Sequence, residues 1–188
     1  MSGLIVPFLN VLPRIHESAW VAPNATVIGD VEIGANTGIW YNVVLRGDSP
    51  GIKIGDNTNI QDGVVIHVSF GRSGTVVGRN ITVGHMALLH ACTIEDDSFV
   101  GMHSTVLDDV VVESGAMVAA GAVVTPGKRV KKGELWAGNP AKMIREIAEK
   151  DLLMFKWSAL HYMELAKAYR GKANMFDGSG PRPDIASI

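Results

Sequence analysis

Aliphatic residues recur at every sixth position through the first two thirds of the chain. One such residue marks each six-residue unit, at Val21, Val27, Ile33, Ile39, Leu45, Ile54, Ile60, Ile66, Val77, Val83, Ile94, Val100, Val106, Val112, Val118 and Val124. A half-buried strand would alternate with a period of two and an amphipathic helix with a period of 3.6, and neither pattern fits. One inward aliphatic residue per six-residue unit indicates a parallel β-helix, in which three units form one triangular turn. The pattern accommodates about six turns between Val21 and Pro126.

Three irregularities interrupt this repeat. The step Leu45–Ile54 contains three extra residues, and the step Ile66–Val77 contains five. The two units of Val83–Ile94 are together one residue short. A regular solenoid does not need such breaks, and functional residues concentrate on loops that interrupt a rigid scaffold. We therefore expect the functional site in this middle region.

The composition changes sharply near residue 130. All 22 valines and 16 of the 21 glycines lie at or before Val130, and Ala, Leu, Met, Glu and Lys dominate afterwards. This is a change from strand-forming to helix-forming residues. We expect five segments, which are an N-terminal lead-in over 1–20, the β-helix over 21–130, a turn out of the solenoid over 131–145, an amphipathic α-helix over 146–170 and a poorly ordered tail over 171–188.

Charge and cysteine content narrow the classes of partner and location. The net charge is −2, which gives no electrostatic basis for binding nucleic acid or an anionic membrane. The single cysteine, Cys92, excludes an intrachain disulfide and fits a reducing compartment. Apolar runs are shorter than the roughly 18 residues that span a bilayer. The first 13 residues lack a basic leader, so we expect a cytoplasmic protein.

The six-residue count places three of the six histidines relative to one another. His67 follows Ile66, and His90 follows Leu89 one turn later, so the two imidazoles stack on one face about 4.8 Å apart. Arg46 lies on the same face one turn earlier. His85 belongs to the preceding face, one turn above Gln61 and Asp62, and cannot easily join the other two histidines within one chain.

A second copy of the chain can bring the three histidines together. A head-to-tail contact that closes with threefold symmetry leaves no free surface. The spacing therefore predicts a homotrimer with a site at each subunit interface. Three histidines with one open position are the arrangement of catalytic zinc, and imidazole also suits cobalt or iron.

The motifs around these histidines resemble those of the γ-class carbonic anhydrase family, in its YrdA-like bacterial branch. They are Arg46-Gly47-Asp48, Asn59-Ile60-Gln61-Asp62, His67, Gly84-His85-Met86-Ala87-Leu88-Leu89-His90, Leu135-Trp136-Ala137-Gly138-Asn139-Pro140-Ala141 and Tyr162. The resemblance extends from Ile15 to Arg170. It implies an all-β solenoid, specifically a left-handed parallel β-helix of hexapeptide repeats with a C-terminal α-helix, and a trimeric assembly.

The resemblance also implies residue roles. His67, His85 and His90 would bind the metal, zinc or else iron or cobalt, without an organic cofactor. Gln61 would orient the bound water or hydroxide, with Asp62 nearby, and Tyr162 of the helix would approach the site; these three form the expected catalytic set. Arg46 and Asp48 would pair across the subunit interface, and Asn59 would support the site from a turn. His103 is expected to be a bystander.

The activity implied is reversible hydration of CO2, with a metal-bound hydroxide attacking CO2 to give bicarbonate, at a low rate. Two alternatives use the same solenoid. A hexapeptide-repeat acyltransferase needs one histidine as a general base and no metal, and a trimeric scaffold needs no chemistry. The three histidines, together with Arg46, Gln61 and Asp62, favour the metal-dependent lyase.

Overall fold

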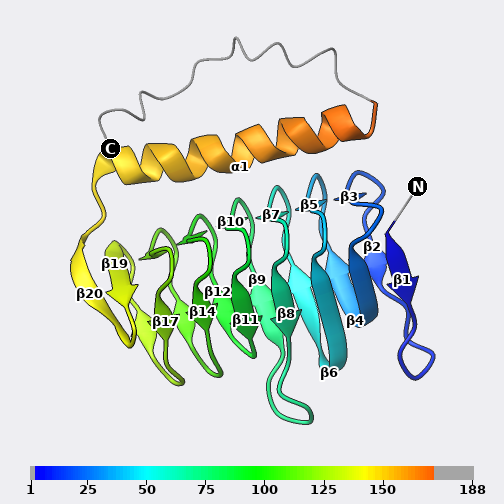
Figure 1. The fold of residues 1–188 in the computed structure, drawn as a ribbon, viewed down its shortest axis with the longest axis horizontal. Helices are drawn as coiled ribbons and strands as arrows, with labels where there is room; N and C mark the ends of the chain where they lie inside the picture. Colours follow the sequence, from blue (N-terminus) through cyan, green and yellow to red (C-terminus); the bar gives the residue numbers. More distant parts are fainter. Residues whose placement is uncertain (1–2, 172–188) are drawn as a thin grey trace.

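The computed structural model describes residues 3–171, and the chain winds through them as a parallel β-solenoid with one long helix alongside (Figure 1). This architecture is that of the left-handed β-helix of hexapeptide repeats. In the part of the chain described, no helix is long and apolar enough to cross a membrane.

Two sheets form the three sides of the solenoid. The larger sheet has twelve strands. Nine of them lie side by side in the order β17 (Val123–Val124), β14 (Thr105–Val106), β11 (Leu88–His90), β8 (Val65–His67), β6 (Val44–Ile54), β9 (Thr75–Val77), β12 (Thr93–Ile94), β15 (Val111–Val112) and β18 (Arg129–Val130). The other three are β4 (Thr26–Ile33), which pairs with β6, and β1 (Leu4–Val6) and β2 (Arg14–Ile15), which both pair with β4. The larger sheet covers two sides, because β6 pairs with β8 through its first residues and with β9 through its last.

The smaller sheet forms the third side. Its eight strands follow the order β20 (Ala141–Glu146), β19 (Glu134–Gly138), β16 (Met117–Val118), β13 (Phe99–Val100), β10 (Thr82–Val83), β7 (Asn59–Ile60), β5 (Gly38–Ile39) and β3 (Trp20–Val21). Every pairing in the two sheets is parallel except β19 with β20.

The core is a stack of the aliphatic residues that mark the six-residue units. Every one of the sixteen positions in the sequence pattern is buried, and Leu45, Ile66, Leu89 and Val106 are 0 % exposed. Strand pairing places Leu45 against Ile66 and Leu89 against Val106, so each inward side chain contacts its equivalent one turn away. Burying one such side chain stabilises the fold by about 1.5–3 kcal/mol. The predicted period is therefore confirmed as the period of the core.

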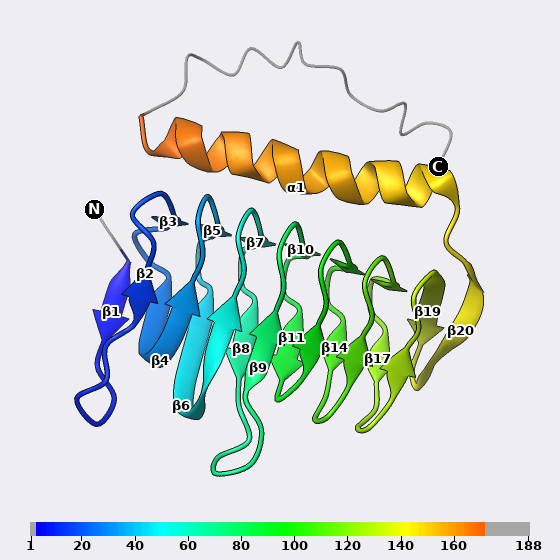
Figure 2. The same cartoon turned by 180° about the vertical axis from the view of Figure 1, so that it is seen from behind.

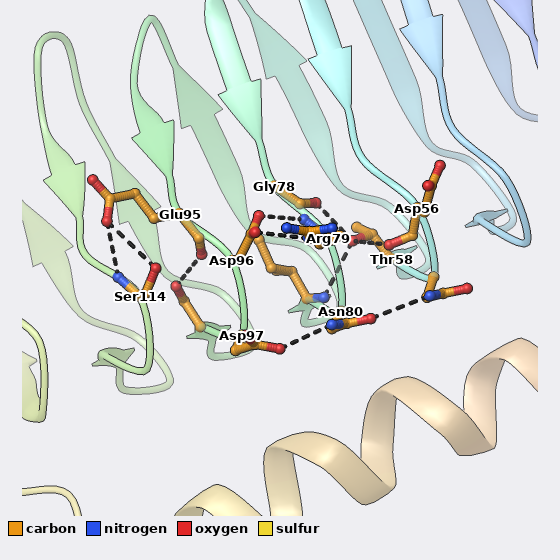
Figure 3. Close-up of polar contacts among 12 residues, drawn as sticks. Asp56, Thr58, Gly78, Arg79, Asn80, Glu95, Asp96, Asp97 and Ser114 are labelled. Carbon is orange, nitrogen blue, oxygen red and sulfur yellow. Dashed lines mark hydrogen bonds and ion pairs between the residues drawn. The ribbon is translucent and has the colours of Figure 1, made fainter.

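One corner of the solenoid shows how the turns are stabilised. Asn36, Asn57, Asn80 and Asp97 occupy equivalent turn positions with φ between 54 and 58°, a conformation that asparagine and aspartate tolerate better than most residues. Their side chains form a ladder, in which Asn57 donates to Asn80 at 3.2 Å and Asn80 donates to Asp97 at 2.9 Å. Figure 3 shows the Asn80 and Asp97 step of this ladder beside the helix. The next turn has Gly115 at this position.

The helix α1 (Glu149–Tyr169) runs along the solenoid on the side of β5, β7 and β10 (Figures 1 and 2). Phe155 stacks on Phe99 with 5.2 Å between ring centroids, and Ser158 hydrogen-bonds Thr82 at 2.9 Å. At its far end, Arg170 donates to the backbone carbonyls of Glu17 and Ser18. The helix therefore connects the last turn of the solenoid to the first.

Both ends of the chain carry more strand than the sequence pattern predicted. The lead-in over 1–20 contains β1 and β2, which pair with β4, and the predicted turn over 131–145 contains the antiparallel pair β19 and β20. These strands provide partners for the terminal turns, whose backbone N–H and C=O groups would otherwise form open edges. Because β20 extends to Glu146, the helix begins at Glu149 instead of residue 146. The tail expected over 171–188 lies, beyond Gly171, outside the described residues.

Candidate metal centre

His67 and His90 lie side by side on one face of the solenoid. His67 ends β8, His90 ends β11, and the two residues are directly paired in the register of the sheet. The imidazole Nδ1 of His67 lies 3.2 Å from Nε2 of His90. The break in the repeat after Leu89 does not disturb this pairing, because the missing residue falls in the turn after β11, where Ala91 has a φ of 48°.

Each of these two rings has a carboxylate at its other nitrogen. His67 Nε2 lies 2.9 Å from Asp48, and His90 Nδ1 lies 2.6 Å from Asp108. A carboxylate accepts hydrogen bonds and does not donate them, so both imidazoles direct an N–H away from each other. The two nitrogens that face each other then both present lone pairs. Such a pair requires a shared proton or a cation between the rings.

The distance between the facing nitrogens suits a metal ion. Two nitrogens bound at about 2.05 Å to one tetrahedral zinc ion lie about 3.3 Å apart. The 3.2 Å between His67 and His90 matches this value. Within residues 3–171 of one chain, no group of three His, Cys, Asp or Glu side chains converges on a common point. One chain therefore offers two adjacent nitrogen ligands of a set that needs a third.

The insertion between Ile66 and Val77 holds Asp108 in place. The segment 67–74 forms a loop closed by an antiparallel bridge between Ser69 and Ser73. The hydroxyl of Ser69 donates to Asp108 at 2.5 Å, while Asp108 faces His90 through its other oxygen. The hydrogen bond from Ser69, and then that from His90, keep the pKa of Asp108 below its ordinary value. Asp108 is thus an ionised acceptor at neutral pH.

His85 lies on the neighbouring corner, in the turn after β10. Its Nδ1 lies 2.9 Å from Asp62, and its Nε2 lies 3.4 Å from the hydroxyl of Tyr162, at the long end of a hydrogen bond. The side chain is 37 % exposed. His85 therefore has a carboxylate on one ring nitrogen, as the other two histidines do, and its second nitrogen faces the hydroxyl of Tyr162.

Gln61 and Asn59 support the backbone of His85 from beneath. The Gln61 carboxamide accepts a hydrogen bond from the backbone N–H of His85 at 3.1 Å and donates to Asn59 at 3.2 Å. Asn59 in turn donates to Thr82 at 2.9 Å, and Thr82 contacts Ser158 of the helix. Gln61 and Asn59 are both buried, and Asn59 lies on strand β7 instead of in the predicted turn. This chain of amides and hydroxyls fixes the His85 corner relative to α1.

Tyr162 extends from the helix toward His85. It is only partly exposed and packs edge-on against Trp40, with 5.3 Å between ring centroids. Removal from water, and then the negative charge of Asp62, raise the pKa of the phenol above its ordinary value of 10.0. Tyr162 is therefore a neutral hydrogen-bond donor across the physiological pH range.

Arg46 and Asp48 form their ion pair within the chain. The guanidinium of Arg46 contacts Asp48, and the same carboxylate contacts His67. Both residues lie on the continuous strand β6, so the contact forms within one chain, and the pairing across a subunit interface stays a prediction. His103, the expected bystander, stacks one turn above His85 through a backbone hydrogen bond of 2.8 Å.

The sequence pattern did not identify Asp108 or Ser69. The register of β11 and β14 pairs Leu89 with Val106. If this register is extended by one residue, His90 lies opposite Leu107 and not opposite Asp108. Asp108 reaches His90 because it sits in the turn one residue further on. The insertion did point to this region, but its contact with a turn about forty residues later is set by tertiary packing, which no local pattern records.

Comparison with known proteins agrees with the fold. The model for "Bacterial transferase hexapeptide (six repeats)" matches residues 13–47 and 91–126. Protein YrdA of Escherichia coli is 37% identical over 93% of this chain and 98% of its own length. "Gamma carbonic anhydrase 2, mitochondrial" of Arabidopsis thaliana is 48% identical over 84% of this chain and 58% of its own.

A solved structure described as a hexapeptide transferase family protein from Anaplasma phagocytophilum is 48% identical, with a TM-score of 0.85 over 88% of this chain and 98% of that one. The chain spans about three fifths of the length of the plant relatives it matches. From these similarities, the chain belongs to the family of hexapeptide-repeat proteins related to the γ-class carbonic anhydrases. Its relatives imply a metal cofactor.

Proposed function

We propose that this protein is a metal-dependent lyase that hydrates CO2 reversibly to bicarbonate, with a low rate. The observation that carries the proposal is that His67, His85 and His90 each have a carboxylate at one ring nitrogen. Histidines that bind metals characteristically donate their second N–H to such a partner, which fixes the tautomer and the direction of the ligand nitrogen. His103, one turn from His85, has no carboxylate contact of this kind among the described ion pairs.

The third ligand would come from a second copy of the chain. His85 lies on a different corner from His67 and His90, and no group of three ligand side chains forms within residues 3–171 of one chain. A homotrimer would bring His85 of one subunit to the histidine pair of its neighbour and form three equivalent sites. The threefold arrangement uses the same two surfaces at each interface and closes on itself.

The metal would be zinc, with iron or cobalt as alternatives, because neutral imidazole suits all three. A zinc ion on three histidines lowers the pKa of bound water to about 7 and so supplies hydroxide at neutral pH. Asp48, Asp62 and Asp108 would hold the three imidazoles as unprotonated ligands. Gln61 and Asn59 would fix the His85 corner, and Tyr162 would donate a hydrogen bond at the edge of the site. Arg46 would hold Asp48 in position.

The primary test measures metal content and CO2 hydration together, on untagged protein purified without oxygen. We expect close to one metal ion per chain and hydration in a stopped-flow assay. His67→Ala, His85→Ala and His90→Ala should each lose most of the metal and remain folded, because none contributes to the aliphatic core. His103→Ala is the matched control, since it changes a histidine on the same corner and should keep its metal. Full metal retention in one of the three variants removes that residue from the ligand set.

Mixed trimers test whether the site is shared between subunits. His67→Ala chains and His85→Ala chains should regain metal when they assemble together, because some interfaces then contain all three histidines. Mixed trimers that form without regaining metal would show that the ligands belong to one chain.

An acyltransferase is the second candidate, because the partly exposed His85 and Asp62 also form a pair of the kind that acts as a general base. The Anaplasma relative carries a transferase description. Acyl transfer from an acyl thioester by metal-free protein, abolished by His85→Ala and unaffected by His67→Ala, would favour this function. A trimer with bound metal and neither activity would favour a scaffold. A cytoplasmic location stays a prediction, and the names of the plant relatives place those proteins in mitochondria.

A further inference from the structure

The inserted loop 67–74 and the turn at Asp108 form a clasp over His90. Five side chains make the clasp, with Ser69 on Asp108, and Arg72 and Ser73 on Asp109. The distances are 2.5 Å for Ser69, 2.6 Å for Arg72 and 3.0 Å for Ser73. Two adjacent carboxylates of one turn therefore take hydrogen bonds from one loop, but only Asp108 also contacts a histidine.

We propose that Asp108 is the positioning residue for His90, and that the five-residue insertion serves to hold Asp108 in place through Ser69. This inference rests on the proposed function, since it concerns the orientation of one of its metal ligands. The two oxygens of Asp108 accept hydrogen bonds from different residues. Oδ2 accepts from Ser69 and Oδ1 accepts from His90 Nδ1. The carboxylate thereby directs the lone pair of His90 Nε2 toward His67.

The geometry also explains why the insertion contains no carboxylate of its own. An acidic residue in the loop would repel Asp108 and Asp109, whereas hydroxyls and a guanidinium bind them. His90 is partly exposed, and an imidazole at such a position can rotate about its side-chain bonds unless a partner holds it. The clasp restricts the rotation of the His90 ring by holding its Nδ1, the nitrogen that faces away from His67.

The first experiment measures zinc affinity by competition with a chelator. Loss of a partner of this kind weakens metal binding by about 10- to 100-fold. We expect a loss near the upper end of this range for Asp108→Ala. Asp108→Asn should give a smaller loss, because a carboxamide retains one of the two acceptor oxygens. Ser69→Ala should weaken binding by less than about 10-fold, since it acts through Asp108.

Asp109→Asn is the matched control. It weakens the contacts that Arg72 and Ser73 of the same loop make with residue 109 but touches no histidine, so the zinc affinity should stay within about twofold of the starting protein. Thermal melting in the presence of chelator checks that every variant is folded. A wild-type affinity in Asp108→Ala, or an equal loss in Asp109→Asn, would overturn the proposal.

The second experiment reads the tautomer of His90 in metal-free protein by 15N chemical shifts of its ring nitrogens. We expect the proton on Nδ1 in the wild type and a shift toward Nε2 in Asp108→Ala, with Asp109→Asn unchanged. This readout needs neither metal nor activity. If the wild type binds neither zinc, iron nor cobalt, the proposed function fails, while the tautomer still decides whether Asp108 positions His90. A wild-type His90 protonated on Nε2 would contradict the inference.

Discussion

The middle turns of the solenoid and its last turns share one core but carry different chemistry. From Ile94 to Val130 the inward residues follow each other at intervals of six without a break, and all are buried. Between Leu45 and Ile94 the same stack continues through two insertions and one deletion. All three candidate ligand histidines and two of their carboxylates lie in this interrupted region. The core is equally tight in both regions, so the breaks affect only the outer surface.

The comparison shows what an interruption provides. In a regular solenoid, outward side chains stand in parallel rows and each contacts its equivalent one turn away, as in the Asn36, Asn57, Asn80 and Asp97 ladder. An inserted loop can instead cross several turns. The loop 67–74 reaches Asp108 and Asp109 in the regular region, so a carboxylate from a uniform turn contributes to the site. Function arises here where an irregular segment contacts a regular one.

The largest expected effect is on stability, and it should differ between two neighbouring residues, one in the core and one on the outer face. Leu89 points inward and is 0 % exposed, whereas His90 points outward. Leu89→Ala leaves a cavity in the stack and should lower the free energy of unfolding by about 2–5 kcal/mol. His90→Ala should change it by less than about 1 kcal/mol when chelator is present, because it removes no core contact. Denaturant unfolding at fixed protein concentration checks both values, and equal losses would contradict the separation.

The sequence predicted the core of the solenoid well, and the contacts on its outer surface and at its two ends less well. The period of six located sixteen buried core positions, because one buried residue per unit is a local pattern, but it did not mark the further buried residues between them, such as Val31, Ile52 and Ile81. The same count paired His67 with His90, because it follows the strand register. It did not reveal Asp108, whose contact depends on a turn and a loop far away in sequence, or the strands at the two ends. Those strands arise from the need of terminal turns for hydrogen-bonding partners, which periodicity does not record.

A smaller effect on stability is expected at the start of the helix, where Arg145 of β20 pairs with Asp151 of α1. The Asp151 carboxylate is 4 % exposed and accepts hydrogen bonds from Arg145 at 2.6 and 3.0 Å and from the backbone N–H of Ala148 at 2.7 Å. Asp151→Asn should reduce the free energy of unfolding at pH 7 by about 1–2 kcal/mol, the lower part of the usual range for charged hydrogen bonds, because Arg145 is 44 % exposed and solvent screens the pair.

The pH dependence of this difference fixes its origin. Arg145 lowers the pKa of Asp151 in the folded protein below the ordinary value of 3.8. The stabilisation is therefore complete above pH 3.8 and is lost as the pH falls through the lower, folded pKa. Unfolding curves of wild type and Asp151→Asn should converge under these acidic conditions. A difference that stays constant down to pH 2 would indicate packing instead of charge.

The interrupted region should also limit proton export during CO2 hydration. Neither insertion offers a free carboxylate, because Asp48 already contacts Arg46 and His67, and residues 67–74 contain none. Each turnover releases a proton that needs an acceptor with a pKa near the working pH. We expect the stopped-flow rate to rise about tenfold as an imidazole-type buffer is increased, because the buffer replaces the missing group. A fast rate independent of buffer would indicate a carrier within the protein, such as Asp62 or His103. No hydration at any buffer concentration with full metal loading would favour another substrate.

The smallest effect should come from Tyr162, which belongs to the helix and not to the interrupted turns. Its hydroxyl contacts His85 at 3.4 Å, and burial together with Asp62 raises its pKa above 10.0. A phenol of this kind stays protonated between pH 6 and 9 and cannot cycle protons efficiently. Tyr162→Phe should therefore change the low-buffer rate by less than about threefold and leave the pH–rate profile in this range unmoved. The difference in phenolate absorbance between wild type and Tyr162→Phe should have its midpoint above pH 10. A midpoint below 10 would contradict this prediction if Tyr162→Phe also lost much of its rate at low buffer and regained it with imidazole. Tyr162 would then be the proton carrier that the inserted loops lack.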